Sequence, residues 1–145
     1  MGWTPAMGTG TLVRRLGEEH TIAVLSRLLA GDIPTVEQAV PPYRQVLLDI
    51  GNGHAERLLS NGSGQRLVYW PKVWAARSLA YVGRRDVGPQ LRSASCDAHW
   101  RVRMTATQTI GRLGIDGLTA ALLERLDDDH VRVRAAALLA MERAG

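Results

Sequence analysis

The chain has 145 residues and a mass of 15.8 kDa, is 46% hydrophobic and 22% charged, and carries a formal net charge of +4. A domain of this size buries roughly two thirds of its unfolded surface, which predicts one folded domain without disulfides or a structural metal. The single cysteine excludes an internal disulfide and a cysteine-rich zinc site, and no stretch resembles a membrane span or a signal peptide. We therefore expect a soluble cytoplasmic protein.

The beginning of the chain is glycine-rich and then becomes amphipathic. Three glycines and a proline fall within residues 1–10, which we expect to be disordered. Apolar residues recur at helical spacing from Thr11 to Ala30. This pattern predicts one amphipathic helix that ends at Gly31.

Shorter elements follow up to the middle of the chain. Thr35 is a candidate N-cap for a short helix over 36–40, which two prolines end. Another helix is predicted over 43–50, inside a degenerate repeat. The sequence Asn-Gly-Ser-Gly at 61–64 is the clearest break in the chain, and it predicts either a loop between helices or a hinge.

From Tyr69 onward the sequence repeats. Gly83, Gly114 and Gly145 are 31 residues apart, and the twelve residues that end at each glycine align without gaps. Apolar residues recur within each unit at the spacing of one helical face. They are Pro71, Ala75, Leu79 and Val82, then Val102, Ala106, Ile110 and Leu113, then Val133, Ala137, Met141 and Ala144. Each unit also holds a second amphipathic stretch, so it is predicted to be a helical hairpin that must stack on a neighbour.

These residues carry a resemblance. Asp128, Val133-Arg134-Ala135-Ala136-Ala137, Met141 and Gly145 together resemble a HEAT repeat, of the short bacterial HEAT-like type seen beside phycobilin lyases. Asp97 with Val102-Arg103, Ala106, Ile110 and Gly114 is similar. The resemblance implies a structural ladder between repeats, with Asp97 assigned to Arg103 and Asp128 to Arg134. It places Lys72 at the corresponding position of the preceding repeat, with Pro71 in the first turn of its helix.

The predicted fold is an all-α, right-handed α-solenoid of three to four stacked antiparallel helix pairs. It is expected to form a single HEAT-like domain over 11–145. Irregular repeats are predicted over 11–68, and regular 31-residue repeats over 69–145.

No recognisable catalytic or metal-binding constellation occurs. No two of the four histidines are three or four residues apart, so no pair shares one face of a helix. No histidine stands in a local context that would activate Cys96, and the chain has no phosphate-binding or dinucleotide-binding motif. We therefore expect no catalytic residue, metal or cofactor.

A stripe of outward positions is the candidate binding surface. In HEAT solenoids the helix with the valine–arginine pair lines the concave side, so the positions between its buried residues are expected to face a groove. The predicted partner-binding stripe is Trp74, Arg77, Ser78, Tyr81, Arg84, Arg85, Gln108 and Arg112. The equivalent positions include Thr105 and Thr109 in the next unit, then Ala136, Leu139, Ala140 and Arg143 in the last. Packing between the irregular and regular halves is the role expected for Trp70 and Trp100, and for Trp74 it is the alternative to facing the groove.

The surplus positive charge lies in the centre of the chain. Residues 66–103 hold eight basic and two acidic side chains, whereas each flanking segment has one more acidic than basic residue. Arginine beside exposed aromatic residues suits an acidic protein segment, and it equally suits phosphate contact with base stacking.

The leading hypothesis is therefore a non-catalytic HEAT-repeat scaffold that binds a protein partner. One alternative is a nucleic-acid-binding protein with a surface like that of HEAT-like DNA alkylpurine glycosylases. The other is a small-molecule or lyase-type enzyme. No membrane partner is expected.

The helix predicted over 131–144 has few charges and would expose Leu139 if nothing covered it. Three explanations stay open: a homodimer through this helix, a longer solenoid, or a covering partner.

Overall fold

The computed structural model describes residues 2–32, 43–61 and 66–144. These residues form eight helices, and the described part of the chain has no strands. The predicted all-α class and stack of helix pairs are therefore confirmed. None of the described helices is long and apolar enough to cross a membrane.

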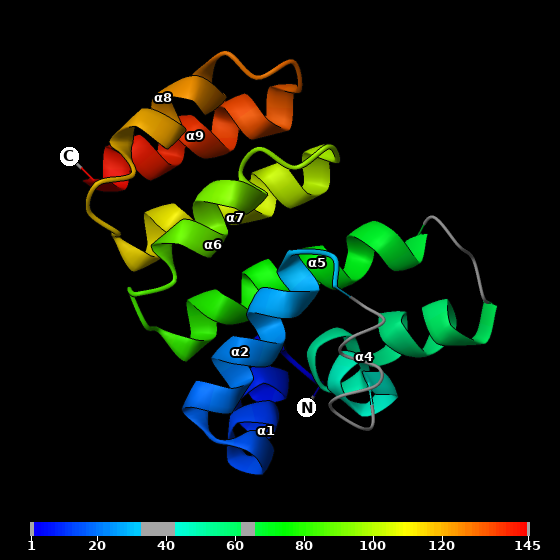
Figure 1. Ribbon diagram of the computed structural model, residues 1–145. Coiled ribbons are helices and arrows are strands. Elements are labelled where there is room, and N and C mark those ends of the chain that lie inside the picture. The colour runs from blue at the N-terminus through cyan, green and yellow to red at the C-terminus, as the bar shows by residue number, and fades with distance from the viewer. Residues whose placement is uncertain (1, 33–42, 62–65, 145) are drawn as a thin grey trace.

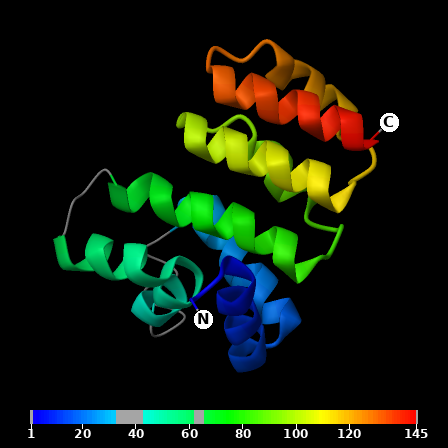
Figure 2. The same ribbon diagram turned by 180° about the vertical axis from the view of Figure 1, so that it is seen from behind.

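The C-terminal half is a regular stack of helices. Helices α5 (Arg66–Val82), α7 (Trp100–Leu113) and α9 (Val131–Ala144) lie side by side like three rungs (Figure 2). The shorter helices α6 (Gly88–Ala94) and α8 (Thr119–Leu126) lie behind them, on the face seen in Figure 1. Residues Val102, Ala106 and Ile110 of α7 are fully buried, as the repeat pattern predicted.

Local signals set the ends of α7. The Nδ1 atom of His99 accepts a hydrogen bond from the backbone N–H of Arg101 at 3.1 Å, so His99 acts as the N-cap. Gly114 ends the helix in the left-handed conformation, with φ of 60°, which a glycine adopts without steric cost.

The first half differs from the prediction in two places. Residues 5–10 are not disordered but belong to α1 (Pro5–Leu16), because the hydroxyl of Thr4 accepts the N–H of Met7 and Pro5 starts the helix. The single helix predicted over 11–30 is wrong as well. Gly17, with φ of 82°, separates α1 from α2 (Glu18–Leu29).

Helix α4 (Tyr43–Asn61) extends well beyond the predicted 43–50, with non-helical dihedral angles at Asn52. It packs against α1, where Gly8 meets the carbonyl oxygen of Asp49 so closely that a side chain would not fit. The predicted helix over 36–40 and the residues 62–64 of the predicted break lie outside the described residues.

Helix α5 begins before the predicted repeat boundary. Pro71 therefore lies inside the helix instead of in its first turn. The aromatic side chains of Tyr69 and Trp70 pack against the core, and this burial favours the extra N-terminal residues despite the N–H that proline lacks.

Helix α2 packs on α5 and approaches α6, so it occupies the layer of the shorter helices (Figure 1). Its buried residues include Val24, Leu25 and Leu28, which join one continuous core with the repeats. The layer beside α5 is thus completed by a helix that is distant in sequence.

Candidate interaction surface

A ladder of ion pairs joins successive repeats. Nζ of Lys72 lies 2.8 Å from Oδ1 of Asp97, in the turn of the next repeat. Arg103 repeats this contact one unit later, since its Nε and Nη2 atoms donate to both carboxylate oxygens of Asp128 at 2.9 and 3.0 Å. The implied pairs of Asp97 with Arg103 and Asp128 with Arg134 involve backbone instead. Nη1 of each arginine donates to the carbonyl of that aspartate, at 3.0 and 2.8 Å.

The ion pair between Arg103 and Asp128 is more buried than the one between Lys72 and Asp97. Burial alone would raise the pKa of the Asp128 carboxyl, but hydrogen bonds from Arg103 and from the backbone N–H of His130 hold that pKa below its ordinary value. The hydrogen bond to Asp128 raises the pKa of Arg103 against the opposing effect of burial. This ion pair stays charged over the physiological pH range and links α7 to the turn before α9.

The turns also carry stacked aromatic rings. Tyr69 stacks on His99 with ring centroids 3.8 Å apart, and Trp100 stacks on His130 at 3.9 Å. The guanidinium of Arg101 lies 4.4 Å from the ring centroid of Trp100. These contacts link the helix starts of successive repeats, which agrees with a packing role for Trp100.

Part of the predicted stripe is buried. Trp74 is only 3% exposed and Ser78 is 0% exposed, so the prediction that they face a groove is wrong. The ring of Trp74 lies against Gly51 of α4, where an added Cβ would be 2.7 Å from the ring. Helices α1 and α4 pack on α5 and cover this part of it.

The same positions are buried in the following repeats. Thr105 and Thr109 of α7 are buried, and Thr109 donates a hydrogen bond to the carbonyl of Ala76 at 2.9 Å. Ala136 and Ala140 of α9 are also buried. Small residues at 78, 109 and 140 are the sequence signal for this close approach between rungs. In α7 and α9 the positions three and seven residues after the start of the stripe are exposed; they are Gln108, Arg112, Leu139 and Arg143.

Three arginines of the predicted stripe bind their own chain. The Nη2 atom of Arg77 donates to the carbonyl of Ile50 at 2.7 Å, and burial lowers the pKa of this half-buried guanidinium. Arg84 forms ion pairs with Glu18, Glu19 and Asp86, which raise its pKa. Arg85 donates to the carbonyl of Gly114.

Two of the remaining stripe residues, Gln108 and Arg112, line a hollow between α7 and α9. Its volume is about 280 Å³, and we call it the α7–α9 groove; it is lined by Gln108, Arg112, Ala136, Leu139, Ala140 and Arg143. Leu139, which lines the groove, is 59% exposed. The guanidinium of Arg112 lies 5.5 Å from the ring centroid of Tyr81 on α5.

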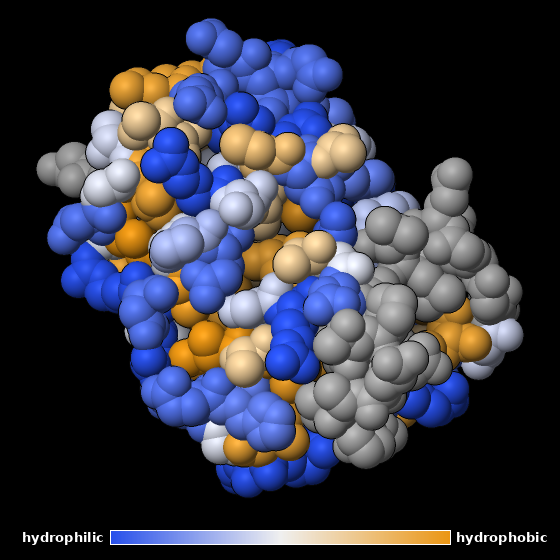
Figure 3. Space-filling model, in the orientation of Figure 1, coloured by the Kyte–Doolittle hydropathy of each residue, from blue (hydrophilic) through white to orange (hydrophobic). Residues whose placement is uncertain are grey.

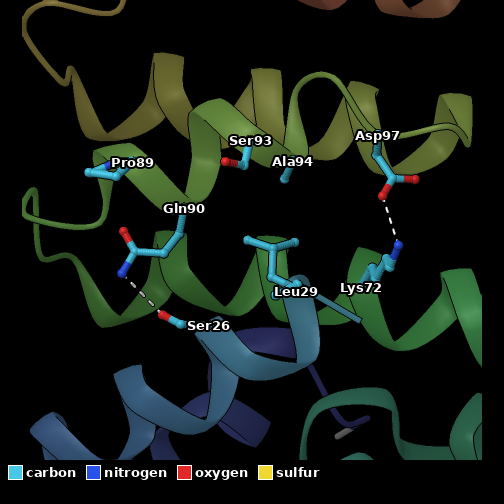
Figure 4. Close-up of a pocket in the computed structure, with 9 residues that line it drawn as sticks. Ser26, Leu29, Lys72, Pro89, Gln90, Ser93, Ala94 and Asp97 are labelled. Carbon is cyan, nitrogen blue, oxygen red and sulfur yellow. Dashed lines mark hydrogen bonds and ion pairs between the residues drawn. The ribbon is translucent and has the colours of Figure 1, made fainter. Parts of the chain in front are cut away.

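A larger hollow of about 480 Å³ lies on the opposite face, between α2 and α6 (Figure 4). Its polar groups mostly bind one another: Lys72 pairs with Asp97, and Gln90 donates to Ser26 at 3.3 Å. On the face of the molecule that Figure 3 shows, hydrophobic residues are visible between hydrophilic ones. Within residues 2–32, 43–61 and 66–144, no cluster of three His, Cys, Asp or Glu side chains could hold a metal ion.

A comparison with protein-family models matches residues 69–142, about half of the chain, to HEAT repeats. A search of curated proteins finds none that matches. The matched segment begins at the first stacked aromatic residue of α5 and ends in α9, so it spans the three rungs and both ion pairs of the ladder. The chain belongs to the HEAT-repeat family.

Proposed function

We propose that this chain is a non-catalytic interaction module that binds an acidic segment of a protein partner through the α7–α9 groove. The observation that carries the proposal is an exposed leucine, Leu139, set between two arginines, Arg112 and Arg143, in a hollow of the stack. Exposed apolar anchors rimmed by charge are typical of protein-binding surfaces.

The two guanidinium groups are available to a partner. Among the described residues, neither Arg112 nor Arg143 takes part in an ion pair, whereas Arg84 and Arg103 each have several acidic neighbours. Arg112 rests on Tyr81, which limits its conformational freedom and leaves its outer N–H groups free to bind a carboxylate.

The floor of the groove supplies the apolar contact. Ala136 and Ala140 are buried between the helices and leave room above them for a side chain of the partner. An apolar residue of the partner would contact Leu139, while acidic residues on either side would reach Arg112 and Arg143. This arrangement favours an acidic peptide that carries an apolar residue.

Nucleic-acid binding is supported less well. Phosphate contact along a duplex needs a series of free cations. Arg77, Arg84 and Arg85 of the predicted basic stripe instead bind groups of their own chain. Two arginines remain beside the groove.

The test compares two variants with the same change in net charge. Arg112→Glu/Arg143→Glu alters the groove, whereas Arg27→Glu/Arg92→Glu alters exposed positions on α2 and α6, on the opposite face. Fluorescence anisotropy would measure binding of an acidic peptide with leucines, the same peptide with serines in their place, and a duplex DNA.

We expect the leucine-containing acidic peptide to bind, with an affinity that falls at least about tenfold in the groove variant and is retained in the control. The serine peptide should bind more weakly. Equal losses in both variants, or stronger binding of DNA that the groove variant abolishes, would contradict the proposal.

A further inference from the structure

The outer face of α9 carries a second, separate surface. On α7 the corresponding face is covered by α9, and Thr107 at its centre is 0% exposed. On α9 the equivalent residue, Leu138, is 55% exposed, and Val131 to one side of it is exposed as well. In the described part of the chain no helix packs on this face.

The ladder is open at the same place. Arg103 uses Nη1 for backbone carbonyls of its own turn, and it uses Nε and Nη2 for Asp128 of the next repeat. Arg134 makes the first of these contacts, to the carbonyl of Asp128 at 2.8 Å. Its Nε and Nη2 atoms have no partner within the described residues. The face therefore presents a positioned guanidinium that can bind a carboxylate.

The exposed residues on this face are arranged symmetrically about Leu138. Arg134 lies four residues before Leu138 and Glu142 lies four residues after it, so all three share one side of the helix. When two copies of α9 run antiparallel with their Leu138 residues in contact, each Arg134 stands opposite a Glu142. The pattern is thus complementary to itself, as a two-fold interface requires.

We propose that the outer face of α9 binds a second copy of this chain, with Leu138 at the two-fold axis and Arg134 paired with the partner's Glu142. The two leucines supply the apolar centre, and two ion pairs flank it. In each ion pair, the partner's Glu142 takes the place beside Arg134 that Asp128 takes beside Arg103. The surface goes beyond the proposed groove, because Leu139 and Arg143 lie on the neighbouring side of the helix and stay accessible.

The interface is small. One helix from each copy buries less than the roughly 800 Å² per partner of a standard stable interface. The dimer should therefore be in exchange with monomer and depend on protein concentration. This makes its charge pairs measurable, since each reversal acts twice in a symmetric assembly.

The first experiment measures self-association of the 145-residue protein by sedimentation velocity over a range of concentrations. Arg134→Glu and Glu142→Arg should each lower the association constant by about tenfold, because two attractive pairs become repulsive. An equimolar mixture of the two variants should restore association, since position 134 of each copy then faces the opposite charge at position 142 of the other. A wild-type protein that stays monomeric, or variants that fail to associate on mixing, would overturn the proposal.

The second experiment locates the axis. Leu138→Cys in a Cys96→Ser background should form a disulfide with its own copy under mild oxidation, because the two side chains meet at the axis. Leu123→Cys, at an exposed leucine of α8, is the matched control and should remain monomeric. Equal cross-linking at both positions would indicate random collision, and none at position 138 would show that the two side chains do not meet; either result would overturn the proposal.

Discussion

At the scale of single residues, the side chain of Arg103 joins two consecutive turns of the stack. Its guanidinium binds both oxygens of Asp128, a carboxylate of Asp129, and two backbone carbonyls of its own turn. The Arg103 and Asp128 side chains are only 12% and 3% exposed, so removal of one leaves the other charge poorly solvated.

Arg103→Ala should therefore lower the free energy of unfolding by about 2–3 kcal/mol. For a chain of this length that corresponds to a melting temperature about 5–10 °C lower. Arg134 occupies the equivalent position but has no carboxylate partner among the described residues. Arg134→Ala should therefore lower the free energy of unfolding by less than about 1 kcal/mol. Differential scanning calorimetry of both variants, in dilute protein, measures the two changes in stability. Equal losses of stability would contradict a stabilising contribution of the ion pair between Arg103 and Asp128.

His99 makes the stability sensitive to acid. Burial lowers the pKa of His99, the charges of Arg101 and Arg103 lower it further, and Asp97 opposes them. The N-cap also needs an unprotonated Nδ1, which accepts the N–H of Arg101. The unfolded chain therefore takes up the proton more readily than the folded one.

The contribution of His99 is present in full above its ordinary pKa of 6.5 and decreases as the pH falls below that value. His99→Asn keeps an oxygen at the N-cap but cannot titrate, so it should lose less stability between about pH 7.5 and about pH 5.5 than the wild type. Urea denaturation at both pH values measures the difference, and parallel losses would rule out His99 as the cause.

At the scale of helices, the spacing between α7 and α9 depends on small residues. A Cβ added to Gly111 would lie 2.7 Å from the Cβ and 2.8 Å from the Cα of Ala140. The second atom belongs to the backbone, so the helices would have to move apart.

Gly111→Ala should cost about 1–3 kcal/mol of stability, more than the helix propensity it gains. Gly53→Ala in α4 is the matched control, because nothing lies within 4 Å of the added Cβ, and it should cause no loss. Thermal denaturation compares the two. A Gly111→Ala variant as stable as the wild type would mean that α7 and α9 are less closely packed than described.

The helices that could be predicted are those whose contacts repeat locally. The period of 31 residues located α7 and α9, because Val102, Ala106 and their equivalents recur at fixed spacing. The pairing of α2 with α5 was not predictable in this way, since it joins segments far apart in the chain. The break at Gly17 has a signal in the sequence, because no apolar residue lies between Leu16 and Ile22 and that step does not keep one helical face.

The candidate site was predictable only in part, because some of the stripe positions face neighbouring helices instead of solvent. The stripe contained Gln108 and Arg112, which line the groove, but it also contained Trp74 and Ser78, which are buried. A repeat pattern shows which positions are apolar. It does not show that α1 and α4 would cover one side of α5.

At the scale of the whole molecule, the central excess of basic residues serves the fold. Lys72 and Arg103 bind aspartates of later turns, and Arg84 binds acidic residues of α2. Arg84 and Arg103 thus pair with acidic residues from the flanking segments, whereas Lys72 pairs with Asp97 inside the segment 66–103. The proposed binding site therefore lies further along the stack, in the α7–α9 groove.

The measurement that tests this account most directly is a two-dimensional ¹H–¹⁵N NMR titration of the labelled protein with the leucine-containing acidic peptide. We expect the backbone amides of Gln108, Arg112, Leu139 and Arg143 to shift, while Trp74 and Ser78 and the hollow between α2 and α6 stay unchanged. Arg112→Glu/Arg143→Glu should remove these shifts without altering the rest of the spectrum. Shifts centred on the hollow between α2 and α6, or spread evenly over all exposed arginines, would contradict the assignment of binding to the α7–α9 groove.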